Sequence, residues 1–110
     1  MLYRERLVGK AVTISLTLYS RELKPKDFVT IEHICFSASV AATRSCRIYI
    51  EGFGYKHYLE YHSVESGVSR RVDINPVTID DSERLAFELP SVVAGETFEV
   101  YLTGTIHKKA

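Results

Sequence analysis

Apolar and polar residues alternate along most of this chain, and this alternation constrains its fold more than any other feature. In Ala11–Tyr19 every second residue is aliphatic, and in Thr97–His107 the pattern returns with Phe98, Val100 and Leu102. A period of two places successive side chains on opposite faces of an extended strand, one dry and one wet. Repeated along a short chain with turn residues between, it predicts an all-β antiparallel sandwich with no helix longer than about two turns.

Eight segments of the chain have a strand-like pattern. With about eight strands in 110 residues, the sequence fits a jelly roll or an immunoglobulin-like sandwich. There is no Trp, so the Cys–Trp–Cys core of antibody domains is absent, and an eight-stranded single jelly roll is the preferred prediction. Residues 1–10 are expected to form an N-terminal arm or edge strand, and residues 11–110 a single β-sandwich domain. The predicted strands are Ala11–Tyr19, Phe28–Ser39, Cys46–Ile50, Tyr55–His62, Val68–Ile74, Val77–Ile79, Leu85–Leu89 and Thr97–His107.

The strand pattern is irregular at two places. In Phe28–Ser39 the apolar positions change from odd to even numbers near Glu32 and His33. Such a phase change predicts a β-bulge, or a strand that crosses from one sheet to the other. Pro76 cannot donate a hydrogen bond to a ladder, so it is expected at an edge or a corner.

The charge of the chain is balanced. It has 14 Lys and Arg residues against 14 Asp and Glu residues, a formal net charge of zero. Proteins that bind nucleic acid through its phosphates usually have a basic excess, so no nucleic-acid partner is expected. The N-terminus has charged residues at once and no apolar run reaches the length of a membrane helix, so neither a signal peptide nor a membrane partner is expected.

The two cysteines are expected to be free thiols. If the strands that contain Cys35 and Cys46 formed a hairpin, Cys46 would face the core and Cys35 would lie opposite Arg47 on the outer face. Cysteines on opposite faces of a sheet cannot form a disulfide.

No residues have the spacing of a catalytic or metal site. The four histidines lack HxH or HExxH spacing, and His57 and His62 would point to opposite faces of a strand. The acidic run Asp80–Glu83 is read as a turn rather than a calcium loop. The sequence therefore predicts a non-enzymatic protein without a cofactor.

Aromatic residues are concentrated in Tyr49–His62, and tyrosine supplies stiff, amphipathic contact area that is enriched at interfaces. Tyr58 is expected to form an outward stripe with Lys56, Glu60 and His62, which a partner could contact. One alternative is a carbohydrate-binding module that uses the strand Tyr55–His62 to stack on sugar rings. The residues predicted to contact a partner are Tyr3, Tyr49, Phe53, Tyr58 and His62.

The stretch Ile79–Ile106 resembles the C-terminal part of small jelly-roll proteins of phage and virus particles. Its acidic turn is followed by a strand, by the turn Ala94-Gly95-Glu96, and by a last strand that reaches Thr103-Gly104. The resemblance implies a structural or attachment protein located in the virion, such as a decoration, head-fibre or tail-accessory protein, with other virion proteins as partners.

Self-association is also expected from the sequence. The chain has no net charge to keep copies apart, and a sandwich has sheet edges that must be covered or blunted. The prediction is a homo-oligomer, with a trimer ahead of a dimer by analogy with virion jelly rolls.

Overall fold

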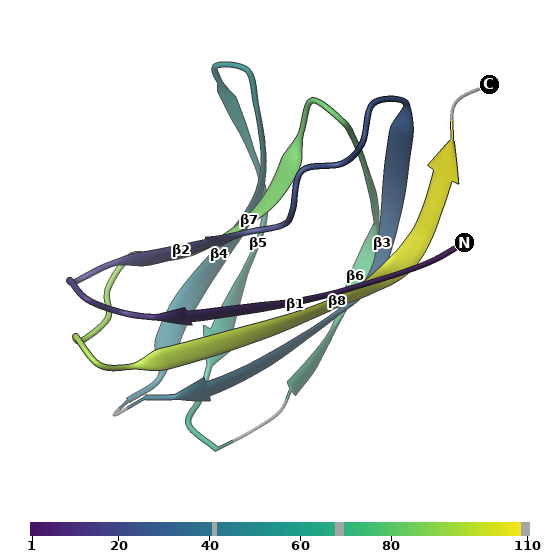
Figure 1. Ribbon diagram of the computed structural model, residues 1–110. Helices are drawn as coiled ribbons and strands as arrows, with labels where there is room; N and C mark the ends of the chain where they lie inside the picture. Colours follow the sequence, from purple (N-terminus) through teal and green to yellow (C-terminus); the bar gives the residue numbers. More distant parts are fainter. Residues whose placement is uncertain (41, 68–69, 109–110) are drawn as a thin grey trace.

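The computed structural model describes residues 1–40, 42–67 and 70–108, and it is a two-layered β-sandwich (Figure 1). Eight strands form two antiparallel four-stranded sheets, and the described residues contain no helix. The predicted all-β antiparallel sandwich is confirmed.

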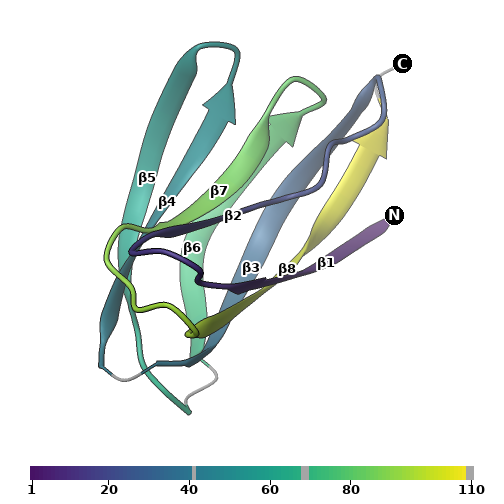
Figure 2. The ribbon, with the colours of Figure 1, turned by 60° about the vertical axis from the view of Figure 1, so that its left-hand side comes forward.

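The first sheet contains the first and the last strand of the chain. Its strands lie in the order β1-β8-β3-β6, with β1 and β6 at the edges. Figure 2 shows both termini at the same end of the sandwich. The strands are β1 (Leu2–Lys10), β8 (Thr97–Lys108), β3 (Asp27–Ser39) and β6 (Arg70–Asp80).

The second sheet has the order β2-β7-β4-β5, which together with the first sheet is the strand order of a single jelly roll. Among the described strands, β4 and β5 are the one pair of successive strands in the same sheet, and every other connection crosses between the layers. The strands are β2 (Leu16–Tyr19), β7 (Arg84–Leu89), β4 (Arg44–Gly52) and β5 (Tyr55–Val64).

The core lies between the sheets and is filled by the alternate residues that the sequence pattern marks as inward. Phe36 of β3 and Phe87 of β7 meet edge to face across the two layers, with ring centroids 6.0 Å apart. The most deeply buried aliphatic side chains come from both layers: Val29, Ile31, Ile34, Ile48, Ile79, Leu85, Leu89, Val100 and Leu102.

The predicted strand Ala11–Tyr19 is wrong over its first half. Only Leu16–Tyr19 is a strand, and Val12 and Ile14 are 80% and 78% exposed. The chain leaves the first sheet at Lys10 and must reach the second sheet before β2 begins, so this alternating segment spans the gap between layers instead of lying on one of them.

The predicted β-bulge in β3 is confirmed. Ile31 pairs with Gly104 of β8 and His33 with the adjacent Thr103, so Glu32 is the extra residue on β3. The strand stays in the first sheet, so the alternative of a crossing between sheets is wrong. Pro76 lies beside this irregularity in the edge strand β6, as predicted.

The two cysteines form no disulfide with each other, as predicted, but for a different reason. The proposed hairpin between their strands does not form, because β3 pairs with β6 and β8 while β4 pairs with β5 and β7. Cys35 and Cys46 therefore lie in different sheets and are not joined by a disulfide. Burial raises the pKa of the Cys46 thiol to about 12, so it is protonated and unreactive at neutral pH.

The predicted strand Val68–Ile74 begins at Val68, which lies outside the described residues, and the side chains of Val72 and Ile74 lie outside the described part as well.

Candidate interaction surfaces

The outer face of the second sheet has tyrosines in register on three of its four strands, with Ala86 of β7 at the fourth position. Tyr19 of β2 and Tyr49 of β4 both pair with Ala86 of β7, and Tyr49 also pairs with Tyr58 of β5. The rings of Tyr49 and Tyr58 are 5.2 Å apart, and the Lys56 ammonium lies 5.2 Å from the Tyr49 ring. We call this surface the tyrosine face.

The neighbours of Tyr49 cover it almost completely, so that only 1% of it is exposed although it lies on an outer face. Burial, above all, raises the pKa of its hydroxyl, and a hydrogen bond with Tyr19 raises it further. Tyr58 remains half-exposed and can be reached by a partner.

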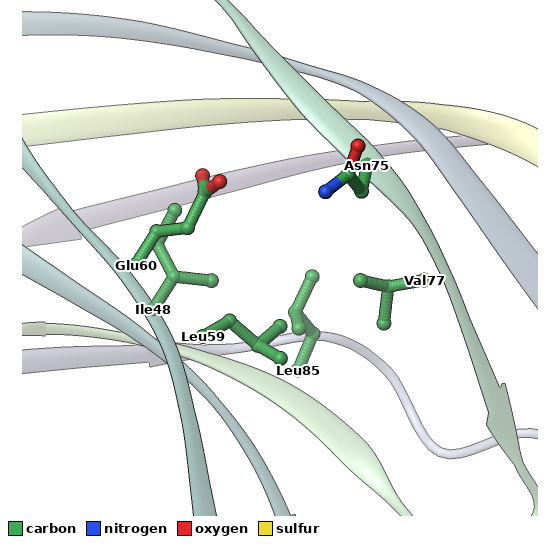
Figure 3. A pocket seen from close by; sticks show the side chains of 6 residues that line it. All are labelled: Ile48, Leu59, Glu60, Asn75, Val77 and Leu85. Atoms are coloured by element: carbon green, nitrogen blue, oxygen red, sulfur yellow. The ribbon is translucent and has the colours of Figure 1, made fainter.

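A bulge in β5 divides the predicted outward stripe. Ile48 pairs with Glu60 and Tyr49 with Tyr58, so Leu59 is an extra residue that reverses the alternation. Tyr58 stays on the outer face, whereas Glu60 points into the space between the sheets (Figure 3). His62 follows Glu60: its ring lies 2.7 Å from the Glu60 carboxylate and its centroid is 6.1 Å from that of Phe36. The prediction that Glu60 and His62 face outward is wrong, because the extra residue Leu59 reverses the alternation of side chains after Tyr58.

Two further predicted contact residues lie in contrasting places. Tyr3 is buried in the core, where its hydroxyl donates a hydrogen bond to Glu5 and the Arg21 guanidinium lies 4.8 Å from its ring. Its prediction as an exposed contact residue is wrong, because β1 turns this side chain inward. Phe53 is 88% exposed at the tip of the β4–β5 hairpin, where Gly54 takes a positive φ of 72° that suits glycine.

Four carboxylates surround a groove at the end of the sandwich that holds the termini. The β2–β3 loop, the β4–β5 hairpin and the β6–β7 turn meet at this end (Figures 1 and 2). The groove has a volume of about 350 Å³, and we call it the acidic groove. Its lining consists of Glu22, Glu51, Gly52, Phe53, Asp81, Ser82, Glu83 and Arg84.

The carboxylates of the acidic groove are partly held by the protein itself. Arg84 donates to Glu51 over 3.5 Å, and Arg84 is the one cation among the described residues that line the groove. Glu83 accepts a hydrogen bond of 2.8 Å from the Tyr55 hydroxyl. Asp81 accepts one of 3.4 Å from the backbone N–H of Lys26. The groove thus has more negative than positive charge on a framework that is already ordered.

The sequence indicated only a part of the acidic groove. The run Asp80–Glu83 is indeed a turn, closed by a 2.8 Å hydrogen bond from the Ser82 N–H to the Asp80 carboxylate. Glu22 and Glu51 come from distant segments, and only the crossing connections of the jelly roll bring them to the same end. No spacing in the sequence could have indicated that convergence.

A smaller cavity lies between the edge strands β5 and β6, at the side of the sandwich opposite β1 and β2. We call it the seam cavity; its volume is about 120 Å³. Figure 3 shows the Glu60 carboxylate and the Asn75 amide along one side of it, with aliphatic side chains around the rest. Its lining residues are Ile48, Leu59, Glu60, Asn75, Val77 and Leu85.

Among the residues that the structure describes, no three or more His, Cys, Asp or Glu side chains are placed to hold a metal ion. Within the same residues there is also no helix long and apolar enough to span a membrane.

No protein-family model matches the chain, and no curated protein matches it. The chain is similar to the crystal structure of Drosophila NLP-core, a structure that provides insight into pentamer formation and histone binding. The two share 16% sequence identity with a TM-score of 0.51, and the match covers 98% of this chain and 99% of the other. At this identity the similarity establishes the β-sandwich fold.

The comparison corrects the functional prediction. The similar structure belongs to a histone-binding protein and not to a particle component, so the predicted virion function is wrong. The carbohydrate-binding alternative and the preference for a trimer also gain no support from it.

Proposed function

We propose that this chain is a non-enzymatic binding module that holds a basic protein segment in its acidic groove and acts as a homo-oligomer. The observation that carries the proposal is the convergence of four carboxylates from three separate segments on one open groove.

The groove is suited to lysine and arginine side chains. Its carboxylates outnumber the single guanidinium of Arg84, so the local field attracts cations although the whole chain is neutral. The exposed ring of Phe53 at its rim offers a cation a further favourable contact. An extended basic segment could therefore place one side chain among the carboxylates and another against the aromatic ring.

The comparison supports both parts of the proposal. Drosophila NLP-core is associated with histone binding and pentamer formation, and histones are rich in lysine and arginine. The zero net charge of this chain imposes no long-range repulsion between copies, which is compatible with self-association.

The experiment is a fluorescence-anisotropy titration of a labelled, lysine- and arginine-rich histone-tail peptide with the full chain. The double variant Glu22→Gln, Asp81→Asn removes two charges of the groove and leaves the Arg84–Glu51 contact in place. We expect about tenfold weaker binding, since each exposed ion pair contributes up to about 1 kcal/mol. Binding should also weaken with added salt, because exposed charges are screened.

The matched control is the double variant Glu32→Gln, Glu65→Gln, which removes the same charge from exposed positions outside the groove. Its affinity should equal that of the unmodified chain. Equal weakening in both variants, or no binding by the unmodified chain, would contradict the proposal.

A further inference from the structure

Three aliphatic side chains lie exposed at one corner of the sandwich, on the loops β1–β2 and β7–β8. Val12, Ile14 and Val93 are 80%, 78% and 56% exposed. We call this group the aliphatic corner. Single exposed aliphatic side chains are normal on a protein surface. Several gathered at one place instead indicate a contact surface.

The backbone of the aliphatic corner is held firmly. The Val92 N–H donates to the Ile14 carbonyl over 2.8 Å, which joins the two loops beside the exposed side chains. Ala11 exchanges two more hydrogen bonds with the second loop: its N–H donates to the Glu96 carbonyl (2.8 Å), and its carbonyl accepts from the Gly95 N–H (2.7 Å). Because the corner is already ordered, docking of its side chains costs little conformational entropy.

A buried ion pair anchors the β7–β8 loop to β4 of the second sheet. The Glu96 carboxylate receives the Arg44 guanidinium at 3.1 Å and the Val93 N–H at 2.6 Å. The Glu96 side chain is only 7% exposed, so this anchor is part of the interior and not a surface contact.

The seam cavity lies on the opposite side of the molecule and has the size of one aliphatic side chain. Ligand sites for cofactors and drug-sized molecules measure about 300–1,000 Å³. An apolar cavity of about 150 Å³ takes up a molecule as small as benzene. At about 120 Å³, with four aliphatic side chains in its lining and the Glu60 carboxylate and the Asn75 amide along one side, the seam cavity fits a branched side chain such as that of isoleucine.

The bulges on both sides of the seam explain why it stays open. In β5 the extra residue Leu59 interrupts the alternation. In β6 the residues between Asp73 and Val77 lie opposite a single residue of β3, Glu32. Asn75 and Pro76 fall in that irregular stretch of β6. Bulges and proline blunt an edge strand against backbone pairing. A partner at this side would therefore bind through side chains rather than by adding a strand.

We propose that the occupant of the seam cavity is Ile14 from a second copy of this chain. The chain itself presents a rigid aliphatic knob on the β1/β2 side and a hole of matching size on the β5/β6 side. Two different patches on opposite sides give a head-to-tail contact, which closes into a ring or continues as a chain of subunits. This inference rests on the self-association part of the proposed function and does not depend on the acidic groove.

The test begins with light scattering of the full chain at micromolar concentration, alongside two defective variants. Ile14→Asp removes the knob, and Val77→Trp fills the hole. For the unmodified chain we expect the mass of an assembly of two or more copies of 12.5 kDa each. For each variant we expect a mass near 12.5 kDa. The control Leu2→Asp, which charges an exposed aliphatic residue outside the aliphatic corner, should assemble normally. Circular dichroism establishes that each variant is folded.

Mixing the two defective variants in equal amounts gives the sharper result. Ile14→Asp retains an intact hole and Val77→Trp an intact knob, so the mixture should form a heterodimer of twice 12.5 kDa and nothing larger. A mixture that remains monomeric, a folded Ile14→Asp variant that still assembles, or an unmodified chain that is monomeric would overturn the inference. The fluorescence-anisotropy titration is repeated with the monomeric Ile14→Asp variant. Peptide binding by this variant shows that the acidic groove works independently of assembly, so the two proposals can fail separately.

Discussion

Replacing Arg44 with Met will lower the free energy of unfolding by about 3–5 kcal/mol, the usual cost of leaving one partner of a buried ion pair without the other. Arg44 and Glu96 are 16% and 7% exposed, and the guanidinium meets both carboxylate oxygens, with Nε–Oε1 and Nη2–Oε2 distances of 3.1 Å. Without the guanidinium, the Glu96 carboxylate remains in the interior and has lost the cationic partner that neutralised it. Urea denaturation followed by circular dichroism measures the change.

Arg47 provides the matched control, since it lies on the same strand and also pairs with a glutamate. The Arg47–Glu88 distance is 3.4 Å and the Arg47 side chain is 38% exposed, so Arg47→Met should cost about 1 kcal/mol or less. In the double variant Arg44→Met, Glu96→Gln, much of the loss should be recovered because no charge is left buried. Equal effects of the two single substitutions would show that the Arg44–Glu96 pair has no special role in stability.

Replacing Gly104 with Ala will destabilise the sandwich by about 3 kcal/mol, the upper end of the range for overpacking. A Cβ at this position would lie 1.9 Å from the Thr30 carbonyl oxygen and 3.0 Å from the Ile31 Cα, both backbone atoms that cannot rotate away. Gly104 pairs with Ile31, directly beside the bulge at Glu32.

Thr103→Ala, at the adjacent position of β8, is the control for Gly104→Ala. It removes atoms from a partly exposed side chain and should change stability by about 0.5 kcal/mol or less. Thermal unfolding of both variants measures the difference, and a Gly104→Ala variant as stable as the unmodified chain would disprove the close contact.

The sequence predicted the class of fold because one physical rule governs most of the chain. Inward and outward side chains alternate wherever a strand has one buried face, and the break in that alternation at Glu32 and His33 marked the bulge in β3. The same rule failed at Leu59, because an aromatic-rich edge strand has apolar side chains on both faces and its phase change leaves no clear trace in the sequence. It also failed at Val12 and Ile14, where alternation occurs in a loop that crosses between layers.

The candidate binding surfaces depend on contacts between distant segments, and sequence patterns could not reveal them. Tyr58 and Phe53 were found from aromatic enrichment and are exposed, but Tyr3 shows that the type of a residue does not determine which face it occupies. The acidic groove needed the connections of the jelly roll, which bring Glu22 next to Asp81. The pairing of strands, and not their presence, was the missing information.

Amide chemical-shift mapping by NMR most directly tests the claim that a basic segment binds in the acidic groove. The full chain, labelled with ¹⁵N, is titrated with the unlabelled histone-tail peptide. We expect the largest shifts at the β4–β5 hairpin around Gly52 and Phe53 and at the β6–β7 turn around Asp81 and Ser82, with little change at the aliphatic corner. Shifts concentrated on another surface, or spread evenly over exposed acidic residues, would contradict the claim.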